Sequence, residues 1–221
     1  ELNELISRLN KCGIDTKKES FYPYKLCDYK PVYGCLFADI LEKYNYWAHG
    51  DLDLVYGDIH KAIPLEIWEQ TDIIGCDKTN RISGPLCFYK NSEFCNKLYE
   101  KINPSLFVSD KYEKIDEIKM TQLIRRISHG NQIEGNPEFF IFFENGDRAP
   151  LTYDFRRREL PNPIEWKKGQ FYKDGGPVTI AYFHFGGGKA ARLRDTSFTD
   201  SLVGIQYPVS HFKVGPTKDG M

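Results

Sequence analysis

The pattern of apolar and polar residues predicts several helices. Apolar residues at positions 2, 5, 6 and 9 follow the helical period, so we expect a helix over Leu2–Leu9, ended by Gly13. Pro31 suits the first turn of a second helix. We expect two more helices, over residues 92–102, with an N-cap at residue 91 or 92, and over Ile115–Ser128. The apolar stripe of the second helix consists of Val32, Leu36, Phe37, Ile40, Leu41 and Tyr44.

Short apolar runs predict strands between and after these helices. Residues 46–58 are typical of a buried strand, and residues 72–76 and 84–89 are also strand-like. From residue 137 the pattern is that of strands, with an Asn-Gly hairpin signal between 138–143 and 151–155. We find no repeat and no low-complexity linker. The sequence therefore predicts a single α/β domain over residues 1–221 that ends in a β-rich extension.

Two aspartates lie near the end of the first predicted strand. On an extended strand Asp51 and Asp53 point to one face, while Leu52 and Leu54 point to the other face and anchor it. The chain has 16 Asp, so about one Asp-x-Asp is expected by chance, and a solvated turn is the alternative interpretation. Apolar residues on both flanks argue against an exposed loop. The segment therefore favours a divalent metal site.

A second group of residues with functional chemistry follows the apolar run 181–185. His184 is positioned to complete the metal site, because imidazole with carboxylates suits Mn²⁺, whereas carboxylates with water suit Mg²⁺. Gly187 lets backbone amides approach phosphate and Lys189 adds a positive charge, so we expect this loop to bind an anion. The alternative is a core histidine followed by a flexible turn. Taken with the acidic strand, the loop favours a metal beside a nucleoside diphosphate.

Composition and charge are those of an ordinary soluble enzyme domain, with 41% hydrophobic and 28% charged residues. A net charge of −1 provides no overall field that would gather nucleic acid or an anionic membrane. No apolar run approaches the roughly 20 residues that span a bilayer, so we expect no transmembrane segment. The six cysteines form no Cys-x-x-Cys pair. We expect reduced, mostly buried thiols and a cytoplasmic location, which includes the cytoplasmic membrane face; a disulfide framework is the alternative.

Four ordered motifs carry a family resemblance: Lys25–Pro31, Tyr46–Asp58, Arg81–Gly84 and Tyr182–Phe185. In this order they look like the GT-A type nucleotide-sugar glycosyltransferases that build bacterial and large-virus surface glycans. The resemblance implies a GT-A (Rossmann-like) α/β fold, with a mixed sheet flanked by helices and a β-rich C-terminal extension. Members of that family begin with a strand and helix that hold the nucleoside. Because the pattern here begins with a helix, we expect that unit to be lacking from this chain.

The resemblance also implies an activity: transfer of a sugar from a nucleoside diphosphate sugar to a hydroxyl of a glycan or lipid-linked sugar acceptor. In that superfamily the Asp-x-Asp binds Mn²⁺ or Mg²⁺ against the donor diphosphate, and here the pair is Asp51 and Asp53. Many members carry a late His-x-x-Gly-x-x-Lys. This chain has His184, Gly187 and Lys189, with one residue fewer before the lysine.

The same motifs imply further residues that contact the donor. Lys25, Asp28 and Lys30 stand just before the helix that leads to the metal strand. The alternative interpretation is a set of surface charges in which Asp28 caps a helix. Ser83 and Gly84, from the third motif, complete the implied donor-binding set.

An inverting transferase needs a carboxylate that accepts the proton of the acceptor hydroxyl. Superfamily members often place an acidic pair after the central strands, and on this basis the resemblance implies Asp116 or Glu117 as the catalytic base. The alternative is an acidic first turn favoured by the helix dipole. A retaining enzyme would need no such base, so the stereochemistry stays open.

Two other classes of protein stay open. The first is a non-catalytic nucleotide-sugar or glycan-binding module, that is, a degenerate transferase, which would bind the donor without turning it over. The second is a metal-dependent phosphohydrolase, which is less supported because such enzymes usually carry denser His and Asp clusters. The basic and aromatic run at residues 153–158 is more typical of a solvated loop than of a nucleic-acid site, so no nucleic-acid partner is expected.

Overall fold

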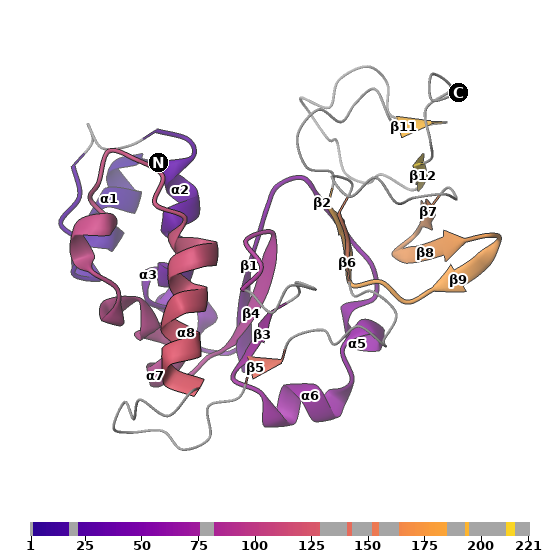
Figure 1. Cartoon of the computed structure of the whole chain (residues 1–221), viewed down its shortest axis with the longest axis horizontal. Coiled ribbons are helices and arrows are strands. Elements are labelled where there is room, and N and C mark those ends of the chain that lie inside the picture. The colour runs from indigo at the N-terminus through magenta and orange to yellow at the C-terminus, as the bar shows by residue number, and fades with distance from the viewer. Residues whose placement is uncertain are drawn as a thin grey trace. The chain divides into compact units, whose positions relative to one another are not determined.

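The structure is a computed structural model. It describes residues 2–17, 22–75, 82–128, 141–142, 152–154, 164–184, 193–194 and 211–214. Contacts within the chain divide it into two compact units (Figure 1). The first unit comprises Glu1–Asp51 and Glu66–Asn145, and the second comprises Leu52–Leu65 and Gly146–Met221. The expectation of a single domain stays a prediction.

The first unit combines short helices with a four-stranded sheet. The sheet has the order β1-β4-β3-β5, where β1 pairs with β4 and β4 with β3 in antiparallel fashion, and β3 pairs with β5 in parallel. Its strands are β1 (Tyr46–Gly50), β3 (Ile73–Gly75), β4 (Leu86–Lys90) and β5 (Ile141–Phe142). Its helical segments are α1 (Leu2–Lys11), α2 (Lys25–Asp28), η2 (Lys30–Val32), α3 (Tyr33–Leu36), α4 (Ala38–Leu41), α6 (Leu65–Gln70), α7 (Glu93–Asn96), η3 (Leu98–Lys101), η4 (Pro104–Leu106), the π-helix η5 (Ile115–Lys119) and α8 (Met120–Ser128).

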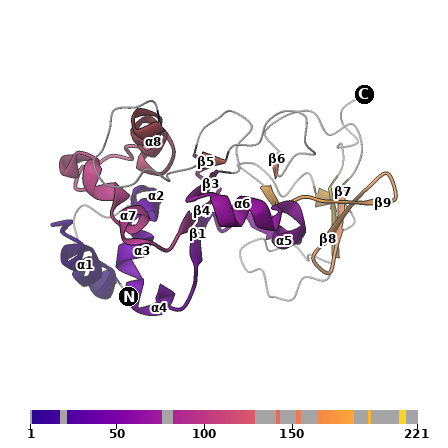
Figure 2. The ribbon, with the colours of Figure 1, turned by 90° about the horizontal axis from the view of Figure 1, so that it is seen from below.

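The core of the first unit lies between its helices and its sheet. In both views α1, α3, α7 and α8 gather beside the β1-β4-β3 strands (Figures 1 and 2). The Trp47 and Tyr89 rings, which face each other across β1 and β4, stack with centroids 4.5 Å apart. Leu9, Val32 and Ile124 are completely buried in the same cluster. Because burying one such aliphatic side chain contributes about 1.5–3 kcal/mol, these contacts fix the helices on the sheet.

Several predicted elements are confirmed. The first helix is α1, and Gly13 follows it in a left-handed conformation with φ of 78°. The predicted helix over 115–128 corresponds to η5 and α8 together, and the strands predicted at 72–76 and 84–89 correspond to β3 and β4. Ser92 is the N-cap of α7, where its side chain accepts a hydrogen bond from the Cys95 backbone. Periodicity and capping thus located these elements correctly.

The predicted second helix is wrong in its length and in part of its apolar stripe. The chain instead forms the four short segments α2, η2, α3 and α4 in succession. Val32 and Leu36 are buried as expected, whereas Ile40 and Tyr44 are exposed. The stripe fails after Phe37 because that residue leaves the helical conformation, with φ of −119°, and the turn resets which face meets the core.

Within its described residues, the second unit contains two small sheets and one helix. The three-stranded sheet has the order β2-β10-β6, in which β10 pairs antiparallel with β2 and parallel with β6. The five-stranded sheet has the order β11-β12-β7-β8-β9, and all its pairs are antiparallel. The elements are β2 (Leu54–Tyr56), α5 (Ile59–Ala62), β6 (Thr152–Asp154), β7 (Ile164–Lys167), β8 (Gln170–Lys173), β9 (Gly176–Val178), β10 (Tyr182–His184), β11 (Leu193–Arg194) and β12 (His211–Val214). Mixed helices and strands confirm the coarse α/β class, and the described elements after residue 128 are strands, as expected.

Two strand predictions are wrong in their pairing. The predicted strand over 46–58 is two strands, because β1 joins the sheet of the first unit and β2 joins a sheet of the second. Leu52, expected to anchor the apolar face, lies in the intervening turn and is 99% exposed, while Leu54 is buried. The predicted hairpin is also absent from the described pairing, since β5 pairs with β3 and β6 pairs with β10.

One disulfide corrects the prediction that the thiols are reduced. Cys12, just after α1, is bonded to Cys35 in α3, with 6.2 Å between their Cα atoms. Cys27, Cys87 and Cys95 are free among the residues that the structure describes. The bond removes one support for a reducing compartment, and the cytoplasmic location stays a prediction. Within the described ranges, no helix has the length and apolar character needed to cross a membrane.

Loss of the disulfide should lower the free energy of unfolding by about 3 kcal/mol, because the bond closes a long loop in the unfolded chain. Its two cysteines are separated by 23 positions. We expect thermal unfolding, followed by circular dichroism, to show a melting temperature several degrees lower after reduction. The control is a Cys12→Ser, Cys35→Ser double variant, which should melt at the same temperature with and without reductant. Equal melting of oxidised and reduced wild-type protein would contradict the pairing.

Candidate functional site

The ammonium group of Lys30 is the centre of a polar cluster in the first unit. It donates hydrogen bonds to Asp51 Oδ1, to the Gly84 carbonyl at 2.8 Å and to Asp116 Oδ2 at 3.4 Å. An ammonium has three donors, so these three oxygens satisfy it although the side chain is only 7% exposed. Tyr112 completes the group by donating its hydroxyl to Asp116 Oδ1 at 3.0 Å. We call these five residues the Lys30 cluster.

Local backbone structure explains why Lys30 reaches both aspartates. The Asp51 N–H donates to the Pro85 carbonyl at 2.9 Å, which continues the β1-β4 ladder one residue beyond β1. Asp51 therefore stays beside Gly84, and the chain leaves the sheet only in the next two residues. Glu117 packs closely over Gly84, since a Cβ there would lie 2.3 Å from Glu117 Oε1 and the Glu117 side chain would have to move. The close approach places the start of η5 against this end of the sheet.

Burial and charge set the protonation of the cluster. Burial raises the pKa of Asp116 to about 6, although the Lys30 charge opposes that rise. Burial lowers the pKa of Lys30, but Asp116 and Asp51 more than offset this, so its pKa is raised and it stays charged. Burial, reinforced by Asp116, raises the pKa of Tyr112, which remains a hydrogen-bond donor. At neutral pH a charged Lys30 therefore lies beside a mostly ionised Asp116.

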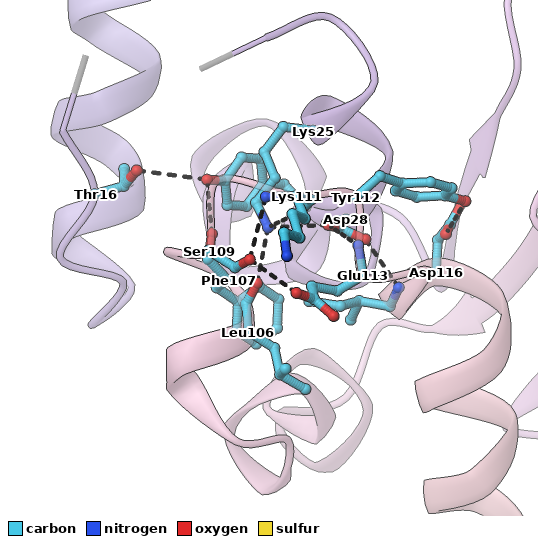
Figure 3. Close-up of polar contacts among 12 residues, drawn as sticks. Thr16, Lys25, Asp28, Leu106, Phe107, Ser109, Lys111, Tyr112, Glu113 and Asp116 are labelled. Atoms are coloured by element: carbon cyan, nitrogen blue, oxygen red, sulfur yellow. Dashed lines mark hydrogen bonds and ion pairs between the residues drawn. The ribbon is translucent and has the colours of Figure 1, made fainter. Parts of the chain in front are cut away.

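Lys25 and Asp28 are placed differently from the sequence interpretation. Both side chains are completely buried, so they are not surface charges, and their polar atoms bond to each other and to the loop 106–115 (Figure 3). Lys25 Nζ donates to Asp28 Oδ2 at 3.0 Å and to the carbonyls of Leu106 and Lys111 at 2.8 and 2.9 Å. Contact of either side chain with a donor stays a prediction, while the described contacts are structural.

The Asp28 carboxylate accepts from two backbone amides as well as from Lys25. Glu113 N–H donates to Oδ2 and Ile115 N–H donates to Oδ1, each at 2.9 Å. Asp28 does not cap the helical segment that follows it, as the alternative interpretation expected, because the N-cap of η2 is Tyr29 without a side-chain bond. Its carboxylate instead accepts from Ile115, the first residue of η5. Ser83 also has a structural contact, since its hydroxyl accepts from the Leu86 N–H at 3.3 Å.

Two polar residues near the cluster carried no signal in the sequence. Tyr112 stands in an irregular loop, four residues before Asp116, with no motif around it. His49 lies on β1 and is 1% exposed, and neither ring nitrogen has a hydrogen-bond partner among the described residues. Burial, reinforced by the nearby charge of Lys30, lowers the pKa of His49 well below its ordinary value. A neutral imidazole is therefore part of the surroundings of Lys30.

The second unit holds the other two predicted metal ligands. Asp53 stands in the turn just before β2, and His184 ends β10, where it pairs in register with Leu54. His184 Nε2 lies 3.3 Å from Asp53 Oδ1. The imidazole is 5% exposed and the carboxylate 38% exposed, so Asp53 is open to solvent on one side. This pair offers one nitrogen and one carboxylate, ligand types that suit Mn²⁺. Gly187 and Lys189, the predicted anion loop, lie outside the described residues.

Comparison with known proteins gives a family but no activity. A model for a family of unknown function, DUF6625, matches residues 1–205, and the chain belongs to that family. Neither the curated proteins nor the solved structures gave a match. Because the family has no described function, the chemistry of the site must support any proposal.

Asp116→Asn should change how stability depends on pH. The pKa of Asp116 is about 6 in the folded protein and 3.8 ordinarily, so the folded state binds this proton more tightly than the unfolded state. Its contribution to stability is therefore present below the ordinary value and is lost as the pH rises through about 6. The full change is about 3 kcal/mol.

Urea unfolding at pH 4 and at pH 7.5 measures this effect. The free energy of unfolding of the asparagine variant should rise relative to wild type between the two pH values. Glu66→Gln, which changes an exposed carboxylate, is the control and should track wild type closely. A constant difference between wild type and Asp116→Asn would contradict the raised pKa.

Proposed function

We propose that this chain is a metal-dependent glycosyltransferase of the GT-A type, which transfers a sugar from a nucleoside diphosphate sugar to a hydroxyl of a glycan. The observation that carries the proposal is the Lys30 ammonium between Asp51 and Asp116. It links the first carboxylate of the Asp-x-Asp to the residue expected to act as base. Three residues implied independently by the family resemblance thus share one buried contact.

The proposed metal ligands are Asp53 and His184, together with Asp51, which precedes Asp53 by two positions. Two residues of chain span at most about 7 Å between Cα atoms, so the two carboxylates are held near each other by covalent structure alone. Two carboxylates and an imidazole form a donor set that fits Mn²⁺, and Mg²⁺ would rely more on water. When bound, such an ion neutralises charge on the leaving diphosphate.

Lys30 has two roles in this proposal. Lys30 donates a hydrogen bond to Oδ1 of Asp51 and thereby orients that carboxylate. It also keeps a positive charge beside Asp116, which favours the ionised form of that acid. With a pKa of about 6, Asp116 is mostly ionised at neutral pH and can accept a proton from an acceptor hydroxyl. A base of this kind corresponds to an inverting reaction, and Glu117 is the second candidate.

The donor contacts proposed from the sequence are less directly supported. Gly84 contributes its carbonyl to Lys30, and Ser83 stabilises the turn before β4. In the proposal Gly187 and Lys189 bind the diphosphate through backbone amides and one ammonium. The predicted donor contacts of Lys25 and Asp28 are not used in this proposal, because both side chains are completely buried and bond to each other.

A donor screen tests the proposal. Thermal shift with a panel of nucleoside diphosphate sugars, each with and without Mn²⁺, should show stabilisation by at least one sugar nucleotide only when the metal is present. That donor should then be consumed in an assay that detects the free nucleoside diphosphate. Binding without any consumption would favour the non-catalytic binding module, and the absence of any metal-dependent shift would overturn both.

Asp53→Ala should abolish Mn²⁺-dependent donor binding, because it removes the most exposed of the proposed ligands. His184→Ala should weaken binding by roughly 10- to 100-fold, as expected for loss of one ligand with the others retained. Isothermal titration calorimetry of Mn²⁺ and of the donor measures both constants. Glu66→Ala, an exposed carboxylate on α6, is the matched control. If both ligand variants bind metal and donor as tightly as wild type, the metal site is wrong.

A further inference from the structure

The loop 106–115 is held in place by side chains and not by regular secondary structure. Between η4 and η5 its backbone polar groups need partners, and α2 with its C-cap residue supplies several of them. Lys25 takes the carbonyls of Leu106 and Lys111, and the Tyr29 hydroxyl donates to the Phe107 carbonyl at 3.0 Å. Figure 3 shows Lys25 and Asp28 of α2 among the loop residues that they contact. The loop is therefore built around a completely buried ion pair.

Asp28 holds the backbone on both sides of a strained residue. Lys114 adopts the left-handed conformation, with φ of 56° and ψ of 42°, although it is not glycine. Such a conformation costs free energy and persists only where its surroundings enforce it. The amides of Glu113 and Ile115, which flank Lys114, both donate to the one Asp28 carboxylate. The carboxylate thus fixes the turn at Lys114.

The turn at Lys114 determines where the next residues point. The Lys114 carbonyl accepts from Ile118 N–H at 2.8 Å and from Lys119 N–H at 3.2 Å, the second being the wider bond of a π-turn. This π-helix begins with Ile115 and carries Asp116 in its first turn, where Asp116 meets Lys30. Single π-turns within helices occur frequently at functional sites. A shift in the turn would move Asp116 away from Lys30.

We propose that Lys25 and Asp28 form a positioning pair, which clamps the left-handed turn at Lys114 and thereby sets Asp116 and Tyr112 against Lys30. The pair touches no reacting group and acts through the loop. Its role in turnover rests on the proposed function, whereas its role in the turn does not. Complete burial of two opposite charges is costly and is not needed for stability alone, which fits a role in fixing one backbone conformation.

The first test removes the pair without leaving a buried charge unpaired. In the Lys25→Met, Asp28→Asn double variant, hydrogen exchange at the Glu113 and Ile115 amides should accelerate by at least about tenfold, because their charged acceptor is lost. Exchange at Ile73 and Ile74 in β3 should stay unchanged and reports on global unfolding. Donor turnover should fall by a similar factor while the Mn²⁺ dissociation constant stays within about twofold, since the hydrogen bonds of the pair go to each other and to the loop and not to Asp51, Asp53 or His184.

The second test changes only the backbone preference of an exposed residue. Lys114→Val should reproduce the double variant, because a β-branched residue strongly disfavours positive φ. Lys101→Val, at an exposed lysine whose φ is not positive, is the matched control and should behave as wild type. The single variant Lys114→Gly should be as active as wild type. Added to the double variant, it should restore most of the turnover, because glycine adopts the turn without the clamp, while exchange at the two amides stays fast, because their charged acceptor is still absent.

These results separate the two proposals. Wild-type turnover and wild-type exchange in Lys114→Val would overturn the positioning role, as would a double variant that Lys114→Gly does not rescue. If the double variant does not fold, Lys114→Val decides the matter, since its side chain is exposed. If wild-type protein consumes no sugar nucleotide with Mn²⁺, the proposed function fails, while the exchange rates of the double variant and of Lys114→Val still support or overturn the clamp.

Discussion

A buried lysine ammonium imposes the constraint on which the candidate site depends. Lys30 cannot keep its charge inside the protein unless three oxygens surround it, because an unpaired buried charge costs several kcal/mol. Those oxygens come from three separate segments: Asp51 after β1, Gly84 before β4, and Asp116 in η5. Each segment must therefore end at the same point in space. The electrostatic requirement of one side chain brings the end of a sheet and the start of a helix together.

A second buried charged group, the Lys25–Asp28 pair, supports the Lys30 cluster through a loop. The Lys25–Asp28 pair satisfies the backbone of a loop that has no ladder or helix of its own. Its carboxylate sets the turn at Lys114, and the turn delivers Asp116 to Lys30. Lys25 and Lys30 are only five residues apart, but their roles differ. Lys25 bonds to the backbone of the loop, whereas Lys30 contacts the carboxylates of the proposed site. Buried ion pairs are a costly route to stability, and conformational specificity is the better explanation for this one.

The proposed chemistry is divided between the two units of the chain. The charged cluster around Lys30 belongs to the first unit, and the pair Asp53 and His184 belongs to the second. Asp51 and Asp53 stand on either side of the boundary, separated by one exposed leucine. In a family without a described function, this division gives each proposed role its own separately testable residue.

Local sequence determined the elements whose residues need only near neighbours. Helical period and capping located α1, α7 and the helix from Ile115, because those signals act within one or two turns of the chain. The chemistry that the residue types indicated, with acid, lysine and imidazole groups at the candidate site, stays a prediction. Tertiary structure alone decided the partners: the strand over 46–58 divides because β1 and β2 join different sheets, Cys12 pairs with Cys35, and Lys25 is buried beneath a loop more than 80 residues later. Pairing and burial depend on contacts between distant segments, and a pattern along the chain carries no record of which segments will meet.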